Sequence, residues 1–259
     1  MAGGESLETA LRTVVGCVVL PVGILLGSIL ALVLALLGRP ATRIHWIYVA
    51  CARLCLWVGG TRLEVEDAHH VDARRAYVVV PNHESNWDSP CVTAGLAKLT
   101  LRFVVKRQLM RIPIFGQALH LTGNVVVVRT DTKRDVREIW KAMGQWLPGV
   151  SVVFFAEGTR ASDGALHPFK MGAFATALGA GLPILPVGIA GTYAIWPKGA
   201  FRLRRGPVVI KVGRPIPTDG LSYDDHTALR DRTFESVARL RAEARSSLWA
   251  NGSDPGGID

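Results

Sequence analysis

Two uncharged apolar stretches dominate the first sixty residues of the chain. Residues 14–37 contain no charged side chain, and as a helix they would be about 36 Å long, enough to cross the apolar part of a bilayer. Pro21 and two glycines interrupt this stretch and favour a kink or a re-entrant turn. Residues 44–60 carry only Arg53 and are rich in tryptophan and tyrosine, which prefer the membrane interface. We therefore predict a membrane-anchoring helical hairpin in residues 1–60, in preference to a single span, a soluble core or a cleaved signal peptide.

From residue 61 onward, short apolar runs alternate with helical or loop segments. Most of the apolar runs have the pattern of strands that are buried on both faces. They are residues 76–80, 101–105, 124–128, 151–156, 183–189 and 207–212. Helices are expected at residues 88–98, 133–147, 170–181 and 224–249. This alternation predicts one α/β domain over residues 61–249, with a mostly parallel or mixed sheet flanked by helices, and a disordered tail at residues 250–259.

The charge and hydropathy of the chain narrow the choice of partner. The net charge is +9, and the mean hydropathy is +0.26. A basic and apolar chain favours a membrane surface or anionic substrates. Nucleic acid is not expected as a partner, because the sequence has no helix-turn-helix signature, zinc-finger spacing or run of interleaved aromatic and basic residues. Arg39, Arg43 and Arg53 near the apolar stretches favour the cell membrane with the catalytic domain on its cytoplasmic face.

The sequence VVVPNHESNWDSP places several reactive groups directly after a buried strand. Pro81 ends the strand, and Ser85 with Asn86 are suited to cap a following helix. His83 would then project from the loop and Asp88 from the first helical turn, where a carboxylate can orient an imidazole as a general base. The same residues also fit a capping box in which Asp88 accepts the Ser85 amide, so the spacing alone leaves both interpretations open.

A second stretch, FFAEGTRASDG, follows the strand predicted at residues 151–156. Gly158 permits a tight turn, Thr159 offers a hydroxyl, and Arg160 offers a planar fork suited to phosphate. Glu157 is able to fix a substrate hydroxyl or a cation, or to form a surface ion pair with Arg160. Because ligands of such sheets bind beyond the carboxyl ends of the strands, both stretches are expected at one edge. A histidine base beside an anion site indicates activation of an alcohol on a phosphorylated amphiphile.

Signatures of several other enzyme classes are absent from the sequence. There is no GxSxG elbow, GxxxxGK[ST] loop, HExxH or GxGxxG. Cys51 and Cys55 have CxxxC spacing, but no histidine or second cysteine pair completes a zinc site. The sequence therefore lacks the motif that would best identify a serine hydrolase, a nucleotide-driven enzyme or a zinc protease.

Four blocks of the sequence resemble the glycerolipid acyltransferases, in particular the 1-acyl-glycerol-3-phosphate acyltransferases. In order, the blocks are NHESNWD, KRQLMRIPIFGQALHLTGNVVVVR, FAEGTR and LPILPV, and the resemblance covers residues 77–191. Ala156 stands where the family usually has proline. Glu84 stands where glutamine or threonine is more common, and it is expected to bring a negative charge beside the phosphate site.

The resemblance implies transfer of a fatty acyl chain from acyl-CoA or acyl carrier protein to the sn-2 hydroxyl of 1-acyl-glycerol-3-phosphate, a lipid of the membrane. It implies His83 as the base and Asp88 as the residue that orients it, with no covalent enzyme intermediate, metal or cofactor. The acceptor-phosphate site that it implies comprises Arg129, Glu157, Gly158, Thr159 and Arg160. Lys106, or a backbone amide near Gly158, would stabilise the oxyanion.

The shared blocks leave the substrate open within the class. A glycerol-3-phosphate acyltransferase, or an enzyme that acylates another lysolipid or a glycolipid, would carry the same motifs. Outside the class, the alternative is a non-catalytic membrane-binding or scaffold protein. A non-catalytic protein would not need the motif residues, yet the chain keeps all four of them: His83, Asp88, Glu157 and Arg160.

Overall fold

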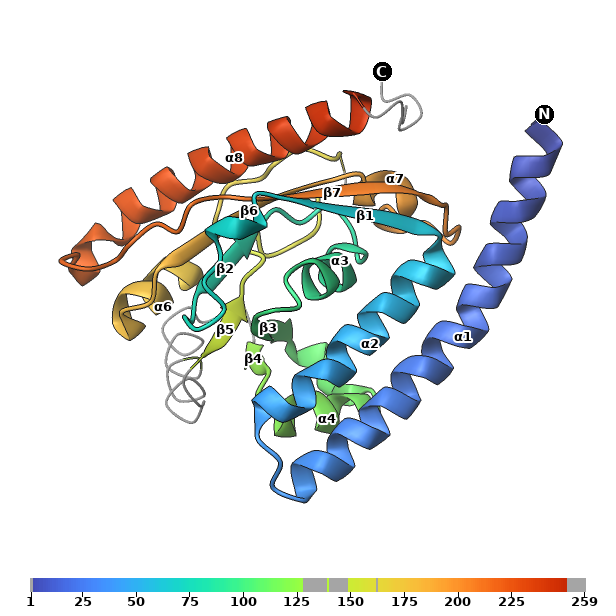
Figure 1. Ribbon diagram of the computed structural model, residues 1–259, viewed down its shortest axis with the longest axis horizontal. Helices are drawn as coiled ribbons and strands as arrows, with labels where there is room; N and C mark the ends of the chain where they lie inside the picture. Colours follow the sequence, from blue (N-terminus) through green and yellow to red (C-terminus); the bar gives the residue numbers. More distant parts are fainter. Residues whose placement is uncertain (1, 128–138, 140–148, 162, 251–259) are drawn as a thin grey trace.

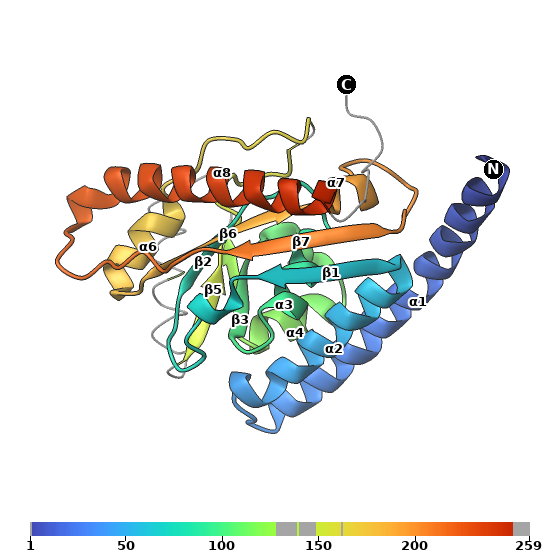
Figure 2. The ribbon, with the colours of Figure 1, turned by 45° about the horizontal axis from the view of Figure 1, so that its top comes forward.

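A seven-stranded mixed sheet with helices on both faces forms the body of the protein (Figures 1 and 2). The computed structural model describes residues 2–127, 139, 149–161 and 163–250. The strand order is β1-β7-β6-β2-β5-β3-β4. The strands are β1 (Thr61–Glu66), β2 (Val78–Pro81), β3 (Thr100–Lys106), β4 (Val125–Val127), β5 (Val150–Val153), β6 (Ile184–Ala190) and β7 (Gly206–Val212). Every pair is parallel except β6 with β7, which confirms the α/β class.

The helices form two layers because the central strands are apolar on both faces. The α-helices after the N-terminal pair are α3 (Asp88–Gly95), α4 (Phe115–Leu121), α6 (Gly172–Ala180), α7 (Thr192–Ile195) and α8 (His226–Ala250), with 3₁₀ turns η1 (Ala68–His70), η2 (Arg107–Arg111) and η3 (Tyr223–Asp225). On β2, Val79 packs in the cluster that contains residues of α2 and α3. Val78 and Val80 face the opposite cluster, with residues of α6 and α8.

The first two helices, α1 (Ala2–Leu36) and α2 (Ala41–Gly59), lie side by side as a hairpin (Figure 1). The re-entrant turn expected near Pro21 is not formed, since α1 continues as a helix through this residue. The neighbouring glycines serve the packing of the pair instead. A Cβ atom at Gly23 would collide with Leu54 of α2, and one at Gly27 would collide with Cys51. Glycine at these positions therefore leaves room for the Leu54 and Cys51 side chains between the two helices.

The exposed side of α1 is apolar over most of its length. Residues Leu7–Leu36 are long and apolar enough to cross a membrane, by length and composition. The large apolar side chains on this side include Leu7, Leu11, Val14, Val18, Val22, Leu25, Leu26, Ile29, Leu30, Val33 and Leu36. A membrane anchor therefore stays the expected role of this helix.

Strand β1 was not predicted from the sequence. It lies at the edge of the sheet, and its exposed Arg62 and Glu64 interrupt the apolar pattern that identified the other strands. The helix expected at residues 133–147 falls outside the described residues apart from Ile139, and the tail expected beyond residue 250 also falls outside them.

Candidate active site

The two halves of the first sequence block meet as a histidine–carboxylate pair. His83 follows the end of β2, and Asp88 is the first residue of α3. The Nδ1 atom of His83 lies 2.8 Å from Oδ2 of Asp88. The Asp88 side chain is fully buried, whereas 14% of the His83 side chain is exposed. The chain turn between β2 and α3 therefore presents one imidazole to the outside with a buried carboxylate behind it.

The same carboxylate also closes the turn. Asp88 Oδ2 accepts the backbone amides of Glu84 and Ser85, each at 2.8 Å. The capping and catalytic interpretations of the sequence are thus not alternatives, because one oxygen makes both sets of contacts. The other oxygen, Oδ1, accepts a 2.5 Å hydrogen bond from the hydroxyl of Thr192. With four donors around it, the carboxylate has little freedom to rotate away from His83.

Two residues that sequence analysis missed hold this arrangement to β6. Asn82 pairs with both backbone groups of Ile189, donating from Nδ2 to its carbonyl at 3.0 Å and accepting its amide at 2.7 Å. Thr192 follows the end of β6 and is fully buried. The available signal was its place just after the strand that contains the fourth block, because β6 runs parallel to β2 and ends at the same edge.

Glu157 connects the first block to the third. Its Oε1 accepts the His83 amide at 2.6 Å, and its Oε2 accepts the His167 amide at 3.0 Å. The side chain is buried, and burial raises its pKa to about 7 against the opposing effect of the two amide hydrogen bonds. Both oxygens face backbone donors, so Glu157 shapes the loops of the site and does not form the surface ion pair that was considered with Arg160.

The expected position of Glu84 beside the phosphate site is wrong. Its side chain is 2% exposed and points toward α8, where Arg241 donates from Nη2 to Oε2 at 3.0 Å. Arg241 also donates to the carbonyl of Gly164, and so contacts the loop after the third block. Burial, and next the charge of Asp88, raise the pKa of Glu84 to about 7, while Arg241 opposes the shift. The turn that brings His83 outward sends the adjacent side chain inward.

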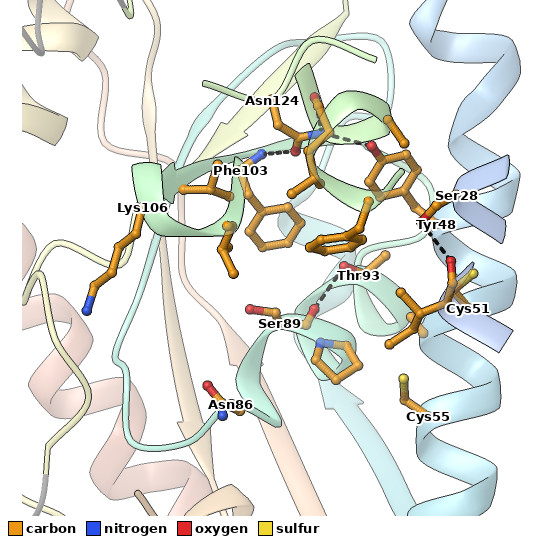
Figure 3. A pocket seen from close by; sticks show the side chains of 18 of the residues that line it. Ser28, Tyr48, Cys51, Cys55, Asn86, Ser89, Thr93, Phe103, Lys106 and Asn124 are labelled. Atoms are coloured by element: carbon orange, nitrogen blue, oxygen red, sulfur yellow. Dashed lines mark hydrogen bonds between the residues drawn. The ribbon is translucent and has the colours of Figure 1, made fainter. Parts of the chain in front are cut away.

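A cavity of about 470 Å³ opens beside His83. The His83 ring stacks on Phe155, with 3.9 Å between ring centroids. In Figure 3, Tyr48 and Cys51 come from α2 on one side of the cavity, and Lys106 and Asn86 lie on the other. The wall formed by α1 and α2 comprises Ile24, Gly27, Ser28, Ala31, Ile47, Tyr48, Cys51, Ala52 and Cys55. The cavity thus joins the partly exposed imidazole to a largely apolar interior beneath the N-terminal hairpin.

The polar groups expected to bind an anion are partly assembled at this cavity. Thr159, Arg160 and Lys106 line it together with His83. Arg129 lies outside the described residues. Gly158 has a φ angle of +75°, as the tight turn requires, and its amide donates to the Phe155 carbonyl at 2.9 Å. That amide is therefore already engaged and does not support the oxyanion role.

Lys170 is a cation that sequence analysis did not assign to the site. Its side-chain carbons and Nζ lie within about 3.0 Å of the position that a Cβ atom on Gly158 would occupy. Its backbone amide donates to the Ala156 carbonyl at 2.8 Å, which holds it against the same loop. A side chain at position 158 would therefore push the Lys170 side chain away from this turn.

Comparison with known proteins agrees with this geometry. Residues 62–190 match the family model described as Acyltransferase. The chain is 33% identical over 204 residues to 1-acyl-sn-glycerol-3-phosphate acyltransferase alpha of Bos taurus, covering 77% of this chain and 70% of that protein. It is 33% identical over 172 residues to the 1-acyl-sn-glycerol-3-phosphate acyltransferase of Limnanthes alba, and the match spans 66% of this chain and 60% of that protein.

A solved structure resembles the whole fold. The crystal structure of the 1-acyl-sn-glycerophosphate acyltransferase PlsC from Thermotoga maritima superposes with a TM-score of 0.79 at 26% identity, covering 93% of this chain and 98% of that one. The fold and the histidine–aspartate site define an acyltransferase. More particularly, the chain belongs to the family of 1-acyl-sn-glycerol-3-phosphate acyltransferases, as the four sequence blocks predicted.

Proposed function

We propose that this protein transfers a fatty acyl chain from acyl-CoA or acyl carrier protein to the sn-2 hydroxyl of 1-acyl-glycerol-3-phosphate, giving phosphatidate. The observation that carries the proposal is the His83–Asp88 pair at the rim of an apolar cavity that Arg160 also lines. A base, a cation and an apolar chamber at one place suit a substrate with a hydroxyl, a phosphate and a fatty chain. The relatives are named for the same acceptor, which supports the proposal.

The geometry of the pair supports general base catalysis. With Nδ1–H directed at Asp88, the Nε2 atom of His83 is left to accept the proton of the acceptor hydroxyl. The hydroxyl oxygen attacks the thioester carbonyl carbon, a C–O bond forms, and the C–S bond then breaks. The departing thiolate takes the proton back from His83. The protein would form no covalent intermediate in this scheme, and no metal is required.

Cations at the same rim suit the charged parts of the reaction. Arg160 and Thr159 line the cavity and are proposed to bind the acceptor phosphate, together with Arg129. Of the two oxyanion candidates, Lys106 at the end of β3 is proposed for this role, because the Gly158 amide is already bonded to the Phe155 carbonyl. Glu157 and Gly158 contribute by shaping the loop that carries Arg160.

The N-terminal hairpin suits the delivery of a lipid substrate. Its exposed side is apolar along α1, and its inner side forms a wall of the cavity. Residues 1–60 are therefore proposed to anchor the protein to the membrane, with the catalytic domain on the cytoplasmic face. The fatty chain of a substrate is proposed to occupy the cavity beneath α1 and α2, where it would be shielded from water.

An assay with the purified full-length protein tests the proposal. Palmitoyl-CoA is supplied with glycerol-3-phosphate, lysophosphatidate or other lysolipids in turn, and the acylated product is identified by its mass. We expect phosphatidate from lysophosphatidate in the wild-type protein, formed about 10²–10⁴-fold more slowly in His83→Ala. Acylation of glycerol-3-phosphate alone would assign the enzyme to the first step of glycerolipid synthesis instead.

A further inference from the structure

The loop between α7 and β7, residues 197–205, holds a phenylalanine out in solvent. Phe201 is 92% exposed, the largest fraction of any large apolar side chain in the part of the chain that the structure describes. Hydrogen bonds within the loop nevertheless hold its backbone in place. Trp196 Nε1 donates to the Ala200 carbonyl at 2.7 Å, and the Ala200 amide donates to the Pro197 carbonyl at 3.1 Å. The ring gains no burial within the protein, and because single exposed apolar residues are common, its surroundings decide whether it has a role.

The 197–205 loop packs against the N-terminal half of α1. The Leu203 amide donates to the Thr13 hydroxyl at 3.1 Å, and Arg205 forms a 3.2 Å ion pair with Glu8. Figures 1 and 2 both place this loop beside the N-terminal half of α1. The exposed apolar side chains on this half of α1 include Leu7 (73%), Leu11 (63%), Val14 (63%) and Val18 (61%). The loop that carries Phe201 is therefore held against the helix that presents these exposed apolar side chains.

Basic side chains surround Phe201 on the loop. Lys198, Arg202 and Arg204 are exposed, and none of them forms an ion pair with another described residue. Two other cations that are close in the sequence do not add to this group of unpaired charges. Lys211 is paired with Glu66 and two further carboxylates, and Arg214 follows the opposite end of β7. The unpaired positive charge is therefore concentrated around the one exposed aromatic ring of this loop.

We propose that the 197–205 loop is a membrane-docking element, separate from the N-terminal hairpin, which inserts Phe201 among the headgroups of an anionic bilayer. Lys198, Arg202 and Arg204 then contact lipid phosphates around the ring. A bilayer fits better than an acidic protein, because the loop is hydrogen-bonded to α1, a helix that is long and apolar enough to cross a membrane. The proposal concerns binding alone and does not depend on the acyl transfer proposed above.

The loop is also connected to the catalytic block. The Ser85 hydroxyl donates to the Trp196 carbonyl at 2.7 Å, and Ser85 pairs with Pro197 as an isolated bridge. Ser85 lies two residues after His83. Docking of the loop would therefore place the catalytic turn next to the bilayer surface, where a lipid acceptor resides.

Binding of the full-length protein to vesicles, without any substrate, tests the proposal. Co-sedimentation is measured over a range of lipid concentrations with phosphatidylcholine vesicles and with equimolar phosphatidylcholine and phosphatidylglycerol. We expect Arg202→Gln/Arg204→Gln to weaken binding to the anionic vesicles by about tenfold or more, and to leave binding to neutral vesicles unchanged. Phe201→Ala should weaken binding to both, and the tryptophan of Phe201→Trp should add fluorescence that brominated lipid quenches.

Matched variants at the other end of β7 serve as controls. Tyr223→Ala removes an aromatic ring that is 57% exposed, and Arg214→Gln/Arg232→Gln removes two exposed charges. Wild-type affinity in both the Phe201 and Arg202/Arg204 variants would overturn the proposal, as would equal weakening in the controls. Unchanged vesicle binding with lost binding to immobilised acyl carrier protein would also overturn it, in favour of an acidic protein partner.

Discussion

Oδ2 of Asp88 lies 2.8 Å from Nδ1 of His83 and accepts the amides of Glu84 and Ser85 at the same distance. One buried oxygen therefore fixes both the turn after β2 and the orientation of the imidazole. Thr192 holds the second oxygen, so the carboxylate is constrained at both ends. This relationship makes the consequences of single substitutions specific enough to test.

His83→Ala should abolish most acyl transfer without unfolding the protein, because the imidazole is the proposed base and lies at the cavity rim. General base catalysis is typically worth about 10²–10⁴-fold, and a loss of this size in kcat is expected. Asp88→Asn should lose much of the same factor by misorienting His83. Steady-state kinetics and thermal unfolding measure the two effects, with exposed His120→Ala as the control. If His83→Ala retained more than about a tenth of the wild-type turnover, the assignment would be wrong.

Thr192→Val should lower kcat by about tenfold with little change in either KM, because it removes one donor to Asp88 and Thr192 does not line the cavity. Thr192→Ser keeps the hydroxyl and should restore most of the loss. A purely structural role would instead reduce thermal stability in step with activity. Parallel measurement of kcat, KM and unfolding temperature separates the two, and failure of serine to rescue would count against positioning through the hydroxyl.

Arg160→Ala should raise the KM for the acceptor more than the KM for the acyl donor, because only the acceptor phosphate is assigned to this guanidinium. Loss of a charged hydrogen-bonding partner costs about 1.5–3 kcal/mol, which corresponds to a rise of about ten- to a hundredfold. Kinetics with each substrate varied in turn measure the split, with Arg214→Ala as a control outside the cavity. A larger effect on the donor would move Arg160 to the acyl-CoA or carrier-protein side.

Glu84→Gln should change how stability depends on pH. The pKa of Glu84 is raised from 4.5 to about 7 in the folded protein, so the folded state binds more protons than the unfolded state between these values. The contribution of Glu84 to stability is therefore fully present below about pH 4.5 and is lost as the pH rises to about 7. Glutamine cannot titrate, and the stability difference between variant and wild type should shift in favour of the variant across this window.

Denaturant unfolding at several pH values measures this effect. Arg241→Met provides the complementary variant, since it leaves the Glu84 carboxylate buried without its cation. It should destabilise the protein more at pH 8 than at pH 5, and the combination with Glu84→Gln should remove that pH dependence. Parallel pH profiles for Glu84→Gln and the wild type would show that Glu84 is not the titrating group.

Leu26→Glu should release the protein from membranes while leaving its fold intact, because this side chain is 61% exposed on the apolar side of α1. Deleting residues 1–60 would be a poorer test, since Leu56 and Val58 of α2 belong to the buried core. Membrane flotation of the variant measures the effect, and circular dichroism checks the fold. Continued tight membrane association of Leu26→Glu would contradict an anchor on this side of α1.

The sequence alone predicted the central strands and the meeting of His83 with Asp88. Runs of β-branched residues on both faces identified the central strands, because a strand between two helical layers must be apolar at every position. The spacing from His83 to Asp88 with a proline and capping residues between strand and helix predicted that the two would meet. The half-buried edge strand β1 was missed for the converse reason, since its charged residues hide the apolar pattern.

Other features were decided only by the tertiary structure. Thr192 reaches Asp88 across 104 residues of sequence, and Arg241 reaches Glu84 across 157. Tertiary structure also decided three further features. Glu84 points inward, both oxygens of Glu157 accept backbone amides, and α1 with α2 forms a wall of the cavity. Local sequence specifies periodicity and turns because these depend on neighbouring residues. Which buried polar group meets which partner depends on how distant elements pack, since each donor and acceptor is satisfied only after the layers have come together.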